Sequence, residues 1–353
     1  MTDSFPRSSM DPSTAGSLTF FQSLSTNIMS VFLNSVLQGM KLHPHTWSWW
    51  KDVIVTKNVC YGDPSIPEHH LDIYRPKEKN GASPVVLYIH GGGFSILSKD
   101  THWMAALLLA KQGYTVFSIN YRLASKAPFP AALHDTFRAA TWVHEHAEEY
   151  GADNQQWLVS GESAGGNLTL SLCIANCFPL GDKAAKAIFA RNLPIRLIIP
   201  ACGLLQVSNP QRYTEKKKIS GFVRSRIMAV SKRYLQGQKH PLADPILLLE
   251  SELPPKRPLP PMMSFVGTKD PILDDTRRLE TALRRRDIPH EIVYYPKAVH
   301  GFHLAVWTKN AKDCWKRQLD FIDRYLFFQP ELTDQDDTES TESFPLPEPQ
   351  TQK

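Results

Sequence analysis

Short runs of consecutive apolar residues recur along the chain and alternate with longer stretches of helical periodicity. The apolar runs lie at 85–89, 115–119, 157–159, 195–199, 262–266 and 291–295, and the helical stretches at 103–112, 131–150, 164–177 and 275–286. An apolar run without polar alternation is typical of a strand covered on both faces. Because such strands alternate with helices, the sequence predicts an α/β fold with a doubly wound, mostly parallel sheet.

Two shorter β-like runs precede this alternating region, at 53–56 and 70–74. Arg75-Pro76 follows the second run directly, and proline ends or borders a strand because it lacks a backbone N–H. These two runs are predicted to form antiparallel strands at one edge of the sheet.

Two segments do not fit the alternation and are predicted to form a helical cap over one domain that spans 18–328. In the first, 18–50, apolar residues recur at helical spacing between 18 and 40, with Ser, Asn and Gln between them. The second, 204–253, is a long connection between two strands, and connections of this length in compact domains are usually functional. The polar residues 1–17 and the acidic residues 329–353 are predicted to be disordered.

Composition and charge narrow the class of protein further. The chain has 42% hydrophobic and 21% charged residues, as ordinary globular proteins do. The formal net charge is +5, and its basic residues are interleaved with acidic ones, which argues against a nucleic-acid partner. The chain shows neither a secretory signal nor 18 consecutive apolar residues, so we expect a cytoplasmic protein without a transmembrane segment. The oligomeric state cannot be read from the sequence.

The basic residues of 204–253 leave two interpretations open. Such charges most often form a solvated surface, but they would also suit recruitment of an anionic substrate or weak peripheral contact with a membrane. The amphipathic pattern at 18–40 lacks Lys and Arg on its polar face up to Met40, which argues against membrane binding by that segment.

The sequence Gly161-Glu162-Ser163-Ala164-Gly165 carries the strongest chemical signal. It matches G-x-S-x-G and lies between a predicted strand and a predicted helix, where a nucleophilic serine stands on a sharp turn. The small flanking residues leave room for that turn, and the following helix N-terminus favours developing negative charge. The alternative is a glycine-rich turn that binds a phosphate or only bends the chain.

A second signal is the glycine-rich sequence 90–94, His-Gly-Gly-Gly-Phe, which directly follows a predicted strand. Acyl transfer passes through an oxyanion, which is stabilised by preorganised backbone N–H donors. We predict the N–H groups of Gly92, Gly93 and Ala164 as these donors, and His90 as a residue that braces the loop. A tight turn without this role is the alternative.

The base and the acid are predicted at the ends of the last two strands. His300 follows the final strand, and histidine is the side chain best suited to accept the serine proton near neutral pH. Asp270 follows the preceding strand and would orient His300. The rivals are His303 for the base, and Asp274 and Asp275 for the acid, although both aspartates look like the first turn of a helix. The chain order Ser, Asp, His is that of α/β-hydrolases.

Over 70–326 the chain resembles the hormone-sensitive-lipase-like family of α/β-hydrolases, which includes many microbial carboxylesterases. The matching sequences are HGGGF at 90–94, YRLA at 121–124, FPAALHD at 129–135, GESAGGN at 161–167, DP at 270–271 and HGF at 300–302. The resemblance implies Ser163, Asp270 and His300 as the triad, the same oxyanion donors, and a cap built from N-terminal helices and an insertion before the acid.

The chain departs from that family at two places. Glu162 stands where members usually carry Asp, and Ser125-Lys126 follow YRLA where many carry Pro-Glu. Neither departure touches the triad. Some relatives on this fold have become receptors by losing the catalytic histidine, whereas this chain retains His300.

The predicted function is therefore hydrolysis of a carboxylic ester with a short to medium acyl chain, or of an acetylated small molecule. Neither a cofactor nor a metal is required by this chemistry. Phe94 and Trp103, together with Phe20 and Phe21, are suggested as an apolar substrate pocket, although they suit a core equally well. The alternatives are an amidase, a lactonase or a natural-product deacetylase with the same triad, and a non-catalytic small-molecule receptor.

Overall fold

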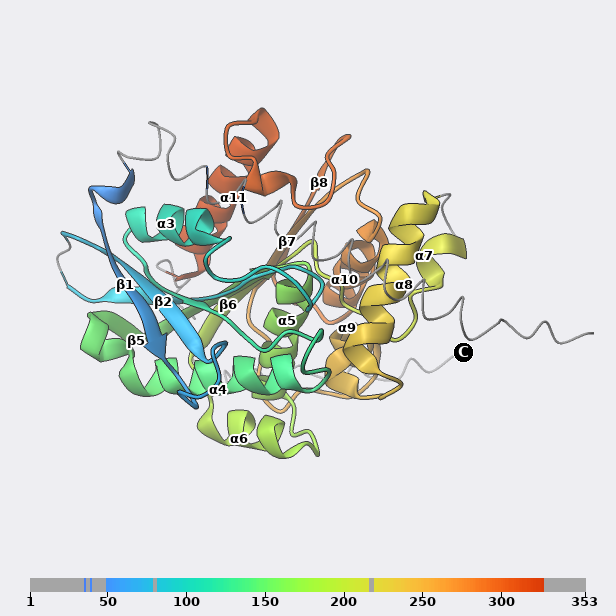
Figure 1. Cartoon of the computed structure of the whole chain (residues 1–353), viewed down its shortest axis with the longest axis horizontal. Coiled ribbons are helices and arrows are strands. Elements are labelled where there is room, and N and C mark those ends of the chain that lie inside the picture. Colours follow the sequence, from blue (N-terminus) through green and yellow to red (C-terminus); the bar gives the residue numbers. More distant parts are fainter. Residues whose placement is uncertain (1–34, 36–38, 40–48, 79–80, 216–218, 327–353) are drawn as a thin grey trace, which may run out of the picture.

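The computed structural model describes residues 35, 39, 49–78, 81–215 and 219–326. Within these residues the strands form one eight-stranded sheet in the order β1-β2-β4-β3-β5-β6-β7-β8 (Figure 1). The strands are β1 Val53–Cys60, β2 His70–Pro76, β3 Ser83–Ile89, β4 Thr115–Ile119, β5 Ala152–Glu162, β6 Ile195–Ala201, β7 Met262–Gly267 and β8 His290–Tyr295.

The sheet is mostly parallel, as the alternating pattern predicts. β1 pairs with β2 and β2 with β4 in antiparallel fashion, so the two early runs lie at one edge as expected. The other neighbouring strands all pair in parallel. The predicted α/β class, with a doubly wound and mostly parallel sheet, is confirmed.

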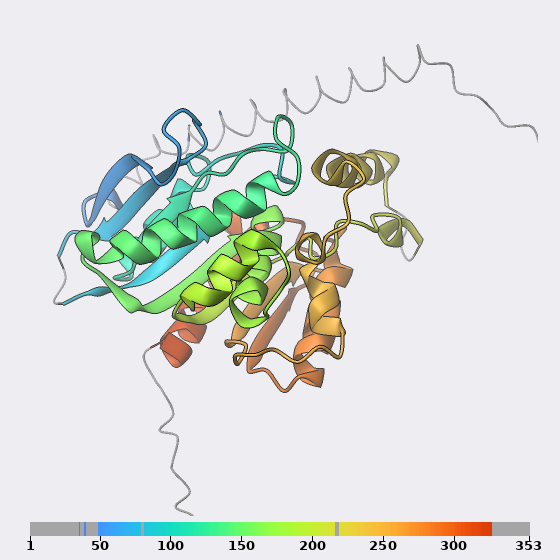
Figure 2. The ribbon, with the colours of Figure 1, turned by 90° about the horizontal axis from the view of Figure 1, so that it is seen from below.

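Helices cover both faces of the sheet (Figures 1 and 2). α3 and α11 pack on one face, and α4, α5, α6, α9 and α10 pack on the other. The helices are α3 Trp103–Lys111, α4 Ala131–His146, α5 Ala164–Cys177, α6 Lys183–Arg191, α7 Arg212–Glu215, α8 Gly221–Leu235, α9 Pro245–Glu250, α10 Leu273–Arg285 and α11 Lys309–Leu326, with 3₁₀ turns η2 Ala147–Tyr150, η3 Pro241–Ala243 and η4 Phe302–Leu304.

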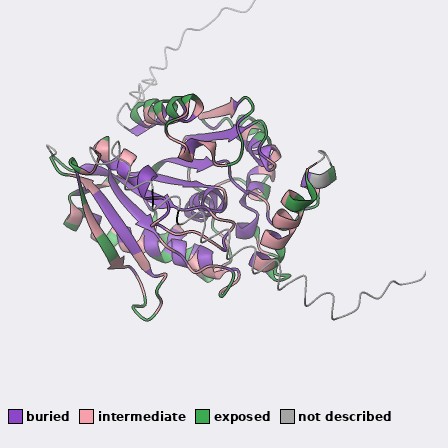
Figure 3. Ribbon diagram, turned by 45° about the horizontal axis from the view of Figure 1, so that its top comes forward, coloured by how far each residue is buried: buried purple, intermediate pink, exposed green. Residues whose placement is uncertain are grey.

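The central strands are buried on both sides, which explains why they read as continuous apolar runs. All seven residues of β3 and all five of β4 are buried (Figure 3). Side chains of β3 alternate between the two faces, with Val85 and Leu87 in one core cluster and Val86 and Tyr88 in the other. Each strand therefore supports two cores at once.

Several boundaries differ from those expected. β5 begins at Ala152, five residues before the predicted start, because Ala152 and Asp153 also pair with β3, ahead of a register shift that leads to Trp157. α4 ends at His146, and the rest of the predicted helix is the 3₁₀ turn η2. Neither α6 nor α11 is among the helices predicted from the sequence, although α11 buries one face at helical spacing.

The segment 204–253 contains α7, α8, η3 and α9, and α7 and α8 stand apart from the sheet (Figure 2). α8 is nevertheless anchored, because its Tyr234 stacks on Phe94 with ring centroids 3.7 Å apart. Asp244 accepts hydrogen bonds from the N–H groups of Val207 and Ser208, which closes the segment on itself. Apart from Ser35, Gly39, Trp49 and Trp50, the other predicted cap segment, 18–50, lies outside the described residues, as do 1–17 and 329–353.

Candidate active site

Ser163 occupies the sharp turn between β5 and α5. Its φ is +57° and its ψ is −114°, a backbone conformation that L-residues rarely adopt. The turn is held from the neighbouring connection, because the Ser163 N–H donates to the Ala201 carbonyl (3.0 Å) and the Leu204 N–H donates to the Ser163 carbonyl (3.1 Å). This is the strained strand-to-helix geometry that exposes a nucleophile above a parallel sheet.

The glycines of the motif are required by close backbone approach. A Cβ on Gly161 would lie 2.5 Å from the carbonyl oxygen of Ile89, and a Cβ on Gly165 would lie 2.1 Å from the same oxygen. Both distances are far inside van der Waals contact. The turn that carries Ser163 therefore packs directly on the end of β3, from which the glycine-rich loop 90–94 emerges.

Asp270 and His300 are brought together at the ends of neighbouring strands. Oδ2 of Asp270, after β7, lies 2.8 Å from Nδ1 of His300, after β8. Asp270 is fully buried, and its Oδ1 accepts a hydrogen bond from the Ile272 N–H (2.9 Å). The His300 side chain is 36% exposed. Its Nδ1 is thus held by the acid, which leaves Nε2 as the nitrogen that can exchange protons with a substrate or a nucleophile.

The surroundings of His300 favour its protonated form. Removal of water from around the ring would by itself lower the pKa of His300. The charge and hydrogen bond of Asp270 outweigh the effect of burial, and the negative charge of Glu162 acts in the same direction as Asp270. The pKa of His300 is therefore raised above its ordinary value. An imidazolium formed during catalysis would be stabilised by the same carboxylate.

The rival residues have other roles. Asp274 and Asp275 lie in the first turn of α10, and buried Asp275 accepts hydrogen bonds from the Leu205 N–H and the Tyr213 hydroxyl. His303 is buried edge-on against Phe265, and burial lowers its pKa to about 4.

His90 braces its loop in the way the sequence suggested. Its ring stacks on Tyr121 with centroids 4.2 Å apart, and its Nδ1 lies 2.7 Å from the Gly91 carbonyl. Burial lowers the pKa of His90 to about 3, and nearby His102 adds to the effect. A ring so enclosed is unsuited to act as the base.

The glycine-rich loop turns sharply beside Ser163. Gly92 and Gly93 have φ values of +111° and +57°, and the Gly92 carbonyl accepts hydrogen bonds from the N–H groups of Ser95 and Ile96 (3.1 Å each). In the sheet, Ile89 pairs with Gly161, so this loop and the Ser163 turn leave the same edge side by side. Ala164 begins α5, directly after Ser163.

Known proteins with similar sequences share this architecture. Residues 86–304 match the family model described as alpha/beta hydrolase fold. The chain belongs to the α/β-hydrolase fold family. A carboxylesterase, NlhH, from Mycobacterium tuberculosis is 30% identical to this hydrolase over 261 residues, which cover 72% of this chain and 77% of that protein. An acetyl esterase from Salmonella schwarzengrund is 29% identical over 265 residues, which cover 73% and 77%.

The solved structure of a bacterial heroin esterase has the same fold as this hydrolase. The two superpose with a TM-score of 0.72 at 22% identity, over 90% of this chain and 98% of that one. Together with the carboxylesterase relatives, the family match confirms the resemblance to the hormone-sensitive-lipase-like group.

Two suggested pocket residues prove to be core residues of the hydrolase. Phe94 and Trp103 are both fully buried, and they belong to core clusters on opposite faces of the sheet. Phe94 stacks on Tyr234, and Trp103 stacks on Trp50 with centroids 5.4 Å apart. Since neither ring reaches solvent, the expectation that they line the substrate pocket is corrected. Phe20 and Phe21 lie outside the described residues.

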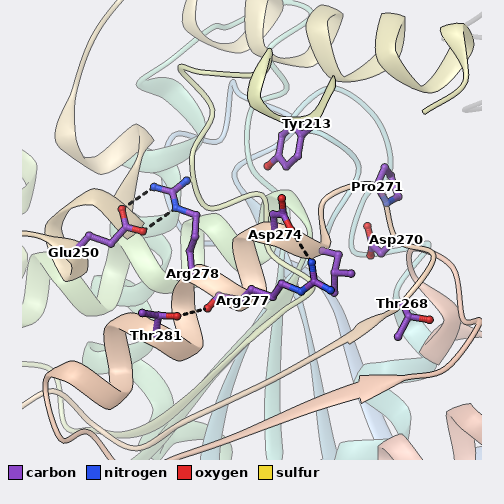
Figure 4. A pocket seen from close by; sticks show the side chains of 10 residues that line it. Tyr213, Glu250, Thr268, Asp270, Pro271, Asp274, Arg277, Arg278 and Thr281 are labelled. Carbon is purple, nitrogen blue, oxygen red and sulfur yellow. Dashed lines mark hydrogen bonds and ion pairs between the residues drawn. The ribbon is translucent and has the colours of Figure 1, made fainter. Parts of the chain in front are cut away.

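A pocket of about 640 Å³ opens beside Asp270 (Figure 4). Its walls are charged, but the charges are matched. Arg278 forms two hydrogen bonds to Glu250 (2.7 and 2.6 Å), and Arg277 pairs with Asp274 (3.0 Å). Paired charges of this kind give no reason to bind an anion.

Cys202, directly after β6, is a neighbour that the sequence analysis did not connect with the site. In the described part of the hydrolase, Cys202, Asp270 and His300 form the one group whose side chains could offer three ligands to a metal ion, with those atoms within 4.8 Å of one another. Asp270 and His300 are already hydrogen-bonded to each other (2.8 Å). We therefore interpret the group as an acid–base pair with an adjacent buried thiol. Cys202 lies beside Asp270 because β6 and β7, which these two residues follow, are neighbours in the sheet.

Replacing Gly92 with alanine is expected to lower kcat about 10²- to 10³-fold, the usual effect of losing one oxyanion donor. The new Cβ would lie 2.0 Å from the Ile96 carbonyl oxygen, at a φ of +111° that L-residues avoid, so the turn and its N–H groups must shift. Steady-state kinetics on a p-nitrophenyl ester would measure the loss.

Gly113→Ala is the matched control for this prediction. Gly113 has a φ of +97°, but its Cβ would meet nothing within 4 Å, so only the backbone penalty is introduced. Both variants should lose thermal stability, and only Gly92→Ala should lose activity. Equal kcat values in the two variants would exclude a role of Gly92 in the reaction.

None of the described helices has the length and apolar character needed to cross a membrane. The cytoplasmic location stays a prediction.

Proposed function

We propose that this hydrolase cleaves carboxylic esters through an acyl-enzyme in which Ser163 is the nucleophile, His300 the general base and Asp270 the orienting acid. The observation that carries the proposal is the 2.8 Å bond between Asp270 and His300, at the sheet edge where Ser163 stands on a strained turn. The carboxylesterase and acetyl esterase relatives support an ester as the substrate.

The mechanism follows from these placements. Nε2 of His300 accepts the Ser163 proton as the hydroxyl oxygen attacks the ester carbonyl. The N–H groups of Gly92, Gly93 and Ala164 stabilise the oxyanion. His300 then gives its proton to the leaving alcohol, and a water molecule activated by the same ring releases the acid.

We further propose that 204–253, together with 18–50, forms a cap that shapes the substrate pocket. Val230 of α8 supports this role, because its Cγ2 would lie 2.9 Å from a Cβ placed on Gly93. α8 is thus in contact with the glycine-rich loop. We expect substrates with short to medium acyl chains or an acetylated small molecule, as the acetyl esterase relatives suggest.

Labelling with a fluorophosphonate, followed by peptide mapping, tests the nucleophile. We expect one modified peptide, labelled at Ser163, and competition by p-nitrophenyl butyrate. The Ser163→Ala variant serves as the control for specific labelling. A folded protein that remains unlabelled would exclude the proposed nucleophile and favour a non-catalytic receptor.

A series of p-nitrophenyl esters then tests the substrate class. We expect the highest kcat/KM with acyl chains of short to medium length, and much slower cleavage of the matched anilides. A preference for long chains would contradict the proposed cap, and a preference for the anilides would identify an amidase.

A further inference from the structure

We propose that Glu162 is a positioning residue that fixes the oxyanion loop to the nucleophile turn. The proposal rests on the function proposed above. Glu162 is the last residue of β5, directly before Ser163, and its side chain is 5% exposed. The sequence alone shows only that Glu replaces the usual Asp of the family at this position.

Both carboxylate oxygens of Glu162 accept hydrogen bonds. Oε1 accepts hydrogen bonds from the Gly91 N–H (2.7 Å) and from Nε2 of His102 (2.5 Å). Oε2 accepts a hydrogen bond from the Tyr88 hydroxyl (2.6 Å). One side chain thereby joins β3, the glycine-rich loop and the residue that precedes α3.

The contact with His102 is charge-assisted. Nε2 of His102 faces the Glu162 carboxylate, and Nδ1 lies 3.1 Å from the Ser98 carbonyl oxygen, so both ring nitrogens have an acceptor. Burial alone would favour the neutral form of each partner. Their mutual attraction outweighs burial, and it lowers the pKa of Glu162 and raises that of His102. Hydrogen bonds between ionised groups are shorter and stronger than neutral ones.

The position of the hydrogen bond between Glu162 and the glycine-rich loop explains how Glu162 would affect catalysis. Gly91 immediately precedes the proposed donors Gly92 and Gly93, so its bond to Glu162 holds the loop just before the N–H groups that face the oxyanion. A Cβ on Gly91 would lie 2.7 Å from Oε1 of Glu162, which shows how closely the carboxylate packs there. Since Glu162 is covalently bonded to Ser163, the same side chain sets the distance between the nucleophile and the donors.

The length of the side chain matters for this role. An aspartate at this position would be shorter by one carbon–carbon bond, about 1.5 Å. Drawn back by that length, the carboxylate could not keep its present distances of 2.5–2.7 Å to all of Tyr88, Gly91 and His102. The Glu in this chain is therefore matched to partners on three separate elements.

Glu162→Gln tests the proposal, because it keeps the shape of the side chain and removes its charge. We expect kcat for p-nitrophenyl butyrate to fall about 100-fold, with KM changed less than threefold, since the oxyanion forms only in the transition state. The affinity of a trifluoromethyl ketone with the same acyl chain, which forms a tetrahedral adduct, should fall by the same factor as kcat/KM. An unchanged kcat, or a rise in KM alone, would overturn the proposal.

Asp135→Asn is the matched control. Asp135 is also a buried carboxylate that accepts hydrogen bonds from a backbone N–H, that of Arg122, and from a histidine, His69. We expect its replacement to lower the melting temperature without a parallel loss of ketone affinity. If both variants lost ketone affinity equally, Glu162 would have only a structural role. Should Glu162→Gln not fold, Tyr88→Phe removes one of its bonds, and a parallel loss of kcat and ketone affinity is expected there too.

Hydrogen exchange separates this proposal from the proposed function. In a Ser163→Ala background, which cannot form an acyl-enzyme, we expect Glu162→Gln to speed exchange of the amides of 91–93 at least tenfold, whereas Asp135→Asn should not. Unchanged exchange would overturn the positioning role even in an active esterase. Faster exchange in a protein that hydrolyses no ester would support it while excluding the proposed activity.

Discussion

Replacing Ser163 with alanine is expected to lower kcat for p-nitrophenyl butyrate about 10⁶-fold, and His300→Ala is expected to have nearly the same effect. The two residues act as one unit, since the serine is a poor nucleophile without the base and the base has no proton to accept without the serine. The double variant should therefore be no slower than either single variant. Stopped assays at high enzyme concentration would measure the three residual rates.

His303→Gln is the control for this cycle, because His303 is the other histidine of the same loop and is buried with its pKa lowered to about 4. Its replacement should cost thermal stability and leave kcat within about tenfold of the wild-type value, since packing rather than proton transfer is lost. Losses that add in the Ser163→Ala, His300→Ala double variant would show that the two residues work independently and would remove His300 as the base.

Asp270→Asn is expected to lower kcat about 10⁴-fold, the effect known for the equivalent change in a serine protease triad. The same variant should shift the pH profile. Neutral His300 is the active form, so kcat/KM falls as the pH falls through the pKa of His300. Asp270 raises that pKa, so the wild-type midpoint should lie above the ordinary value of about 6.5. Without the carboxylate charge, the midpoint should move to lower pH.

The profile of kcat/KM between about pH 5 and 9 measures this shift. Asp274→Asn is the control, because Asp274 lies in the first turn of α10 and pairs with Arg277 (3.0 Å). The Asp274→Asn variant should leave the midpoint of the fall in kcat/KM at low pH, the acid limb of the profile, unchanged. An acid limb that stays fixed in Asp270→Asn would mean that another group titrates, and His300 would lose its assigned role.

Local sequence patterns were enough to predict the alternation of strands and helices and the position of the strand-to-helix turn at Ser163. The apolar run at 115–119 and the helical stretch at 164–177 match β4 and α5 to the residue, and both elements are buried along their whole length. Glycines 161 and 165 signal a turn because only glycine permits so close a backbone approach, and the structure contains that approach to Ile89. The choice of Asp270 over Asp275 also followed from local context, because the latter sits in a helical turn.

The tertiary structure alone decided what surrounds those residues. Large aromatic side chains such as Phe94 and Trp103 suit a pocket or a core equally well. Their stacking on Tyr234 of α8 and on Trp50 places them in the core. Tyr88 and Gly91 lie more than 70 residues before Glu162 in the chain, and they meet it because β3 and β5 are neighbours in the sheet. Periodicity records which face of an element is buried, but it carries no information on which strands are paired. The candidate triad residues could therefore be proposed from the sequence, whereas the contacts that hold the glycine-rich loop beside Ser163 depend on the order of the strands.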